Sequence, residues 1–181
     1  MVRDRETWMK FVLTIITALL VTTARGQDNP GLERQSLKGL NAVYIFVGLS
    51  KDFEDAGLSA DSIKTDAKSK IRRAGIRVIE TENELTKTPG HPYLLIAVEG
   101  SRVEAVYPYW ANMGLNQRVL LARDASIKPA GRFRGTTFTA ETWSVGIVGV
   151  RNLNQVHLVG GEIESLVDKF VDAYLSVNLK K

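Results

Sequence analysis

The chain contains no cysteine and only two histidines among its 181 residues. Without cysteine there can be no disulfide, thiol nucleophile, thiolate metal site or lipid-modified cysteine of a bacterial lipoprotein. The two histidines, His91 and His157, lie 66 positions apart, and no second ligand or carboxylate stands at a useful spacing beside either. His91 lies between Gly90 and Pro92, which is typical of a turn residue. We therefore expect no metal site and no cofactor.

The chain also has only a small excess of charge of one sign, since it contains 24 basic and 20 acidic residues. The formal net charge is +4, and without residues 1–26 it falls to +2. Nucleic-acid binding needs a concentrated basic patch that neutralises phosphates, so we expect no nucleic-acid partner. Apolar residues make up 44% of the chain, which is ordinary for a globular domain.

Catalytic motifs are missing as well. The sequence has no Gly-x-Ser-x-Gly elbow, no Gly-x-Gly-x-x-Gly turn and no Walker pattern. Gly160 and Gly161 are interpreted as a bend that leads into a helix. Three glutamates, Glu99, Glu104 and Glu141, lie on or beside expected strands and can supply the carboxylate pair of a glycoside hydrolase. We expect a protein that is not an enzyme. The alternative is a small hydrolase that acts on an envelope polymer through these carboxylates.

One long apolar run is present, from Phe11 to Val21, and only two threonines interrupt it. A net positive segment precedes the run, and Ala24 and Gly26 follow it, which is typical of a secretory signal peptide over residues 1–26. Eleven helical residues span about 17 Å, short of the roughly 30 Å of a bilayer core. We expect cleavage before Gln27 or after Ala24, and a periplasmic or secreted protein with no stable membrane insertion.

Beyond residue 26, the pattern of polar and apolar residues predicts a flexible leader over residues 27–38 and a single α+β domain over residues 39–179. A helix is expected between an N-cap at Ser59 and a C-terminal Gly75. With a final helix, the order is β-α-β-β-β-β-α, which predicts a two-layer sandwich whose mixed sheet carries two helices on one face. The other face is expected to be polar. The expected strands are 41–49, 76–80, 93–103, 110–123 and 133–150, and the final helix is 161–178.

The candidate binding site combines aromatic and basic side chains. Tyr107, Tyr109 and Trp110 are expected at a hairpin end, where aromatic rings can stack on sugars, anchor a protein partner or simply cap the core. Basic residues on the adjoining strands can contact an anionic envelope polymer or lipid, or can form a solvated edge. The predicted site therefore consists of Tyr107, Tyr109, Trp110, Arg118, Arg132 and Arg134.

Several short segments resemble a group of uncharacterised secreted bacterial proteins, over about residues 37–178. They are Gly57-Leu58-Ser59, Arg72 to Val78, Pro92-Tyr93-Leu94, Thr142-Trp143 with Gly146 and Gly149, and Leu166 to Phe170 through Tyr174-Leu175 to Asn178. The plan of the domain is also similar to the N-terminal part of TolB and to lipoprotein activators of penicillin-binding proteins. These similarities imply a non-catalytic interaction module whose partner is an envelope protein or an anionic envelope polymer.

Overall fold

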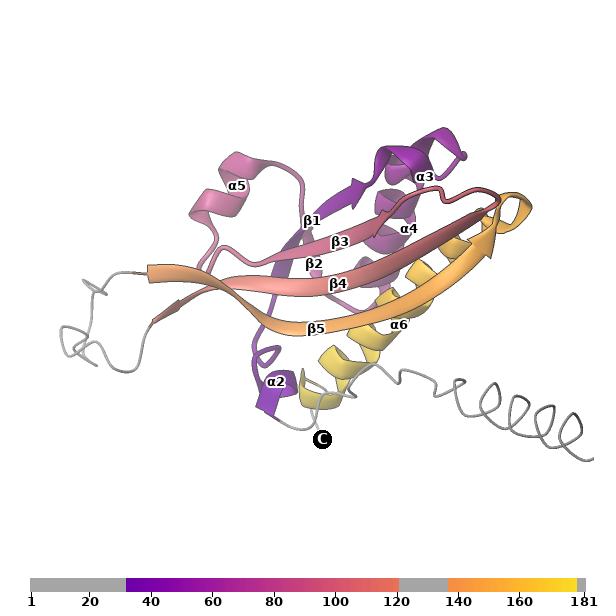
Figure 1. Ribbon diagram of the computed structural model, residues 1–181. Helices are drawn as coiled ribbons and strands as arrows, with labels where there is room; N and C mark the ends of the chain where they lie inside the picture. Colours follow the sequence, from indigo (N-terminus) through magenta and orange to yellow (C-terminus); the bar gives the residue numbers. More distant parts are fainter. Residues whose placement is uncertain (1–31, 121–136, 179–181) are drawn as a thin grey trace, which may run out of the picture.

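The computed structural model describes residues 32–120 and 137–178, which form a five-stranded sheet in the order β2-β1-β3-β4-β5 (Figure 1). The first strand, β1, runs parallel to both β2 and β3, whereas β3, β4 and β5 form an antiparallel meander. The mixed sheet is as predicted. The strands are β1 (Ala42–Leu49), β2 (Arg77–Ile79), β3 (Tyr93–Gly100), β4 (Val106–Leu120) and β5 (Thr137–Asn152).

Two long helices, α4 (Ala60–Arg73) and α6 (Leu158–Asn178), lie on the same face of this sheet (Figure 1). This confirms the predicted α+β sandwich, and we call the opposite face the open face. The shorter elements are α2 (Leu32–Gln35), α3 (Lys51–Asp55), α5 (Glu82–Lys87) and η1 (Leu153–Gln155). No helix within the described ranges is long and apolar enough to cross a membrane.

The ends of α4 follow from its sequence. The Ser59 hydroxyl accepts a hydrogen bond from the backbone N–H of Ser62 at 3.2 Å, which is the expected N-cap. After the last turn, Gly75 adopts a φ of +85°, a conformation that side-chain-bearing residues rarely adopt. The predicted helix is therefore confirmed at both ends.

The main core lies between the two long helices and the sheet, and a second, smaller cluster of Ala42, Tyr44 and Ile79 is buried on the opposite face with Leu85 of α5 packed against it. Alternate residues of the central strands, such as Ile45, Ile96 and Met113, point toward the helices and are fully buried. Phe170 of α6 is also fully buried, and its ring packs edge-to-face against Trp143 of β5 with centroids 5.3 Å apart. The apolar side of α6 therefore faces the sheet at Phe170.

Residues 32–38, which were expected to belong to a flexible leader, form α2 and bury the Leu37 side chain completely. The backbone N–H of the next residue, Gly39, donates to the side-chain oxygen of Asn178 at the end of α6. The Ser36 hydroxyl donates to the Thr142 carbonyl oxygen of β5. These contacts tie the segment to distant parts of the chain, so a local sequence pattern did not reveal them.

Candidate functional site

The aromatic segment at Tyr107–Trp110 lies in β4, in the first residues after the turn that joins β3 to β4, and not in the turn itself. Tyr107 and Tyr109 face the helices and are each 4% exposed, and both rings pack edge-to-face against Phe53. Trp110 points to the opposite face and is 46% exposed. The two tyrosines therefore cap the core, and Trp110 is the ring of this segment that a partner can reach.

The start of β4 was missed because of Pro108. Proline lacks a backbone N–H, and a proline inside a strand argues against that strand. Here β3 ends at Gly100, which lies opposite Tyr109, so Pro108 lies beyond the end of β3 and is paired with β5 alone. A strand paired on one side tolerates proline, and the ladder with β5 continues to Val106.

A polar cluster on the core side joins β4, β5 and α6. The Tyr109 hydroxyl donates to one carboxylate oxygen of Glu162, and Arg151 forms an ion pair with the other. Burial raises the pKa of Tyr109 above its ordinary value, and the Arg151 charge opposes this shift. Through Glu162, Tyr109 and Arg151 hold the N-terminal part of α6 against the sheet.

On the open face, the Trp110 indole lies over Gly146 of the neighbouring strand. A Cβ atom added to Gly146 would lie 3.1 Å from the indole nitrogen, so glycine leaves the space that the ring occupies. Val148 is the cross-strand partner of Trp110, and Val150 is that of Pro108. All four side chains are exposed, Val148 to 74%. We call Pro108, Trp110, Val148 and Val150 the Trp110 patch.

The expectation of a polar open face is therefore wrong at this end of the sheet. Asn112 and Asn116 lie on β4, but β5 contributes the exposed Val148 and Val150 to this face. Further exposed apolar side chains, those of Val103 and Leu153, lie near the same end. Exposed apolar side chains therefore gather at the end of the sheet where β4 begins and β5 ends, although the exposed Glu99 of β3 lies opposite Trp110.

Arg118, the predicted basic residue that the structure describes, does not adjoin this patch. Arg118 is exposed near the other end of β4, eight residues from Trp110 and therefore about 26 Å away along an extended strand. Arg132 and Arg134 lie outside the described residues, as do Arg123 and Lys128. The structure thus separates Arg118 from the aromatic side chains that were expected beside it.

The strand carboxylates are also spread out. Glu99 lies opposite Trp110 and Glu141 opposite Asn116, six positions further along β4 or about 20 Å. Glycosidase carboxylate pairs lie about 5–9.5 Å apart, so Glu99 and Glu141 do not form one. Glu104 lies in the turn before β4, with a φ of +54°. Within the described ranges, no three His, Cys, Asp or Glu side chains gather where they could hold a metal ion.

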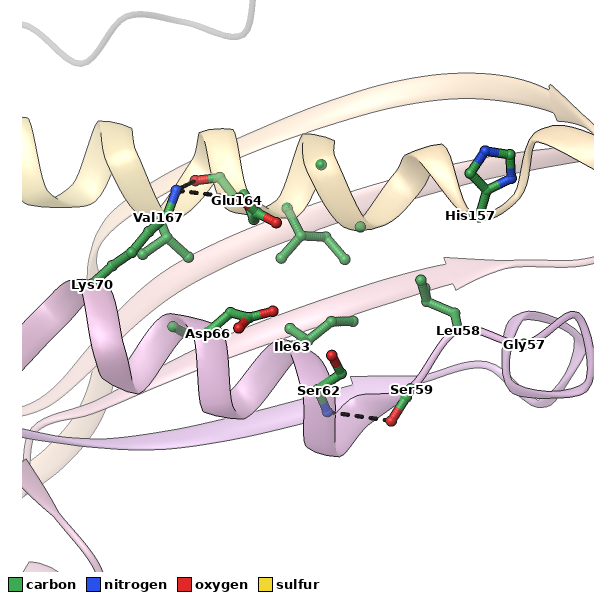
Figure 2. A pocket seen from close by; sticks show the side chains of 14 residues that line it. Gly57, Leu58, Ser59, Ser62, Ile63, Asp66, Lys70, His157, Glu164 and Val167 are labelled. Atoms are coloured by element: carbon green, nitrogen blue, oxygen red, sulfur yellow. Dashed lines mark hydrogen bonds and ion pairs between the residues drawn. The ribbon is translucent and has the colours of Figure 1, made fainter.

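A groove of about 280 Å³ lies between α4 and α6, on the side of the helices away from the sheet, and sequence reasoning missed it (Figure 2). Its apolar floor includes Ile63 and Val167, and His157 stands at one end. His91 is elsewhere, in a turn with a φ of +45°, as its neighbours predicted. Gly160 and Gly161 do not form the expected bend before the last helix but lie inside its first turn, where they line this groove. The sequence feature that could have indicated the groove is the pair of adjacent glycines within the final helix.

No protein-family model matches this chain. No curated protein matches it either. Among solved structures, it is similar to a PelC dodecamer from Paraburkholderia phytofirmans, with 16% sequence identity and a TM-score of 0.44. That match covers 86% of this chain and 97% of the other. A dodecamer of a PelC variant from the same organism is 18% identical over 83% of this chain and 96% of the other, with a TM-score of 0.43.

Proposed function

We propose that this protein is a non-catalytic binding module of the cell envelope or the secreted space, and that it docks a protein partner through the Trp110 patch. The observation that carries the proposal is the exposure of Trp110 across Gly146, beside two exposed valines. Tryptophan is the residue type most enriched at the energetic centres of protein interfaces. The apolar run at residues 11–21 supports export.

The chemistry of the patch favours a protein over an anionic polymer. Its four side chains carry no charge, and Arg118 lies about 26 Å away along the strand. Binding an anionic polymer requires cations close to the contact, whereas a protein interface is built around a desolvated apolar centre. The partner we propose therefore presents an apolar surface of its own.

β5 is also the edge strand of the sheet, next to β4 alone. Its outer side presents backbone groups that another chain can pair with, and the exposed valines alternate along it. An extended segment of the partner can therefore add to the sheet and contact Val148 and Val150 with alternate side chains. This geometry makes position 148 the best place for a probe.

The experiment places a photo-crosslinking amino acid at Val148 or, as the matched control, at Phe138. Phe138 is an exposed apolar residue near the other end of the same strand. We expect cross-linking in envelope extract to join one discrete protein to position 148 and not to position 138. With that protein purified, Trp110→Ala should weaken binding about 30-fold, equivalent to about 2 kcal/mol, while Phe138→Ala has little effect.

Three results would contradict the proposal. One is the same cross-linked products from both positions. Another is a cross-link only to a second copy of this chain, which would make the patch a self-association surface. The last is a purified partner that binds the Trp110→Ala variant as tightly as the wild type, provided that circular dichroism shows both to be folded.

A further inference from the structure

The groove between α4 and α6 lies away from the Trp110 patch and has a different chemistry. One wall is a polar stripe of α4 formed by Ser59, Ser62 and Asp66, and the other is the first turns of α6 with Gly160, Gly161 and Glu164. We call this the α4–α6 groove. It runs from Ser59 to Lys70, about 16 Å along the helix, which matches four or five residues of an extended peptide.

The two glycines of α6 have no structural reason to be glycine. Neither has a positive φ, and a Cβ atom at Gly161 would meet nothing within 4 Å. At Gly160 the nearest atom would be a Leu58 methyl carbon at 4.0 Å, an ordinary contact. Glycine is among the least favourable residues in a helix. What the pair adds is open space above α4, which is the space of the groove.

The groove also contains a carboxylate without a cation. Lys70 stands one turn after Asp66 on α4, but its ammonium group lies 2.7 Å from the Asp168 carboxylate of α6 and 3.6 Å from that of Glu164. Among the described residues, no ion pair or hydrogen bond forms with the Asp66 side chain. Figure 2 shows its carboxylate in the space between the two helices. Asp66 is exposed, and Glu164 shares the Lys70 ammonium group with Asp168, so the groove carries more negative than positive charge.

We propose that the α4–α6 groove binds a short extended peptide segment through a lysine or arginine side chain. The aliphatic part of that side chain packs over the glycines and the apolar floor, and its cationic end lies between Asp66 and Glu164. The Ser59 and Ser62 hydroxyls, at the start of α4, donate hydrogen bonds to the carbonyl groups of the peptide. This site is independent of the Trp110 patch, because the two lie on opposite sides of the sheet.

The test titrates the protein with a fluorescein-labelled pentapeptide, Ala-Val-Lys-Val-Ala, blocked at both ends. Identical peptides carry glutamine or glutamate at the centre, and anisotropy reports binding at low ionic strength. We expect the lysine peptide to bind about fivefold more tightly than the glutamine peptide, and the glutamate peptide to bind most weakly. Trp110→Ala should leave all three affinities unchanged, which separates this proposal from the function proposed above.

Matched variants locate the contact. Asp66→Asn should reduce affinity for the lysine peptide about fivefold, whereas Asp61→Asn, an exposed aspartate on α4 outside the groove, should not. Gly160→Ala combined with Gly161→Leu should abolish binding while the melting temperature stays the same or rises. Equal affinity for the lysine and glutamine peptides, equal effects of the two aspartate substitutions, or undiminished binding by the folded glycine variant would overturn the proposal.

Discussion

At the scale of single residues, two glycines of β5 leave space for aromatic rings of β4 on the two faces of the sheet. On the core side, a Cβ atom at Gly149 would lie 2.5 Å from the Tyr109 hydroxyl oxygen. On the open side, one at Gly146 would lie 3.1 Å from the Trp110 indole nitrogen. Each glycine makes room for an aromatic ring of β4. Tyr109 can therefore fix α6 while its neighbour Trp110 is presented to solvent.

Replacing Gly149 tests the core-side contact. Gly149→Ala should lower the free energy of unfolding by about 1–3 kcal/mol, because the added methyl group overlaps the Tyr109 ring. Urea denaturation measures the change. Gly48→Ala in β1 is the matched control, since nothing lies within 4 Å of a Cβ atom there. Equal stability of the two variants would show that the Tyr109 ring moves aside without cost.

The raised pKa of Tyr109 predicts a loss of stability in alkali. In the unfolded chain the hydroxyl ionises near pH 10, whereas in the folded protein burial delays ionisation to higher pH. The contribution of the neutral Tyr109 hydroxyl to the free energy of unfolding is therefore complete below about pH 10. It is lost as the pH rises through the folded-state pKa of Tyr109.

Comparison with Tyr109→Phe isolates this effect, because other titrating groups are common to both proteins. Urea denaturation at pH 9 and pH 11 should show that the wild type loses more stability than the variant over this range. Equal losses in the two proteins would contradict the assignment of the shift to burial of the Tyr109 hydroxyl.

At the scale of elements, the sequence revealed those elements whose pattern is local. α4 was predicted to its ends because Ser59, the apolar positions and Gly75 all lie within the helix or beside it. The expected element order does not contain α5, although Thr81 caps this helix by accepting a hydrogen bond from the N–H of Glu84, a recognisable capping pattern. The start of β4 and the order of α2 depend on distant neighbours, so no local pattern indicates them.

The candidate site was predicted only in part, because it too depends on contacts between segments that are distant in the sequence. Alternation in β4 places Trp110 and Tyr109 on opposite faces, but the sequence alone does not say which face is covered. The α4–α6 groove requires two helices about a hundred residues apart to lie side by side, as Lys70 and Asp168 do. Local patterns cannot supply such a pairing.

The packing of α6 against the sheet has its own test. Phe170→Ala should lower the free energy of unfolding by about 3–5 kcal/mol, because the ring is fully buried against Trp143. Thermal or urea denaturation measures this loss. Asp172→Ala, an exposed position on the same helix, should change stability by less than about 0.5 kcal/mol. A melting temperature unchanged by Phe170→Ala would show that the Phe170 ring does not pack in the core between α6 and the sheet.

At the scale of the whole molecule, the sheet separates two surfaces of different chemistry. The Trp110 patch on the open face is apolar and uncharged, whereas the α4–α6 groove carries unbalanced carboxylates on the outer side of the helices. Because the two surfaces share no contacting residues, substitutions in one should leave binding at the other unchanged. The two proposals can therefore fail or succeed separately.

The most direct test of the central claim follows the fluorescence of Trp110 itself. The chain has three tryptophans, Trp8, Trp110 and Trp143, and Trp8 lies in the segment that we expect to be removed on export. In the chain starting at Gln27 and carrying Trp143→Phe, Trp110 is therefore the sole indole. The measurement is acrylamide quenching of this emission with and without a saturating amount of the partner cross-linked through position 148. We predict a shift to shorter wavelength and a smaller quenching constant when the partner binds, because the indole leaves water. Emission and quenching that stay unchanged on the fully bound protein would contradict the account.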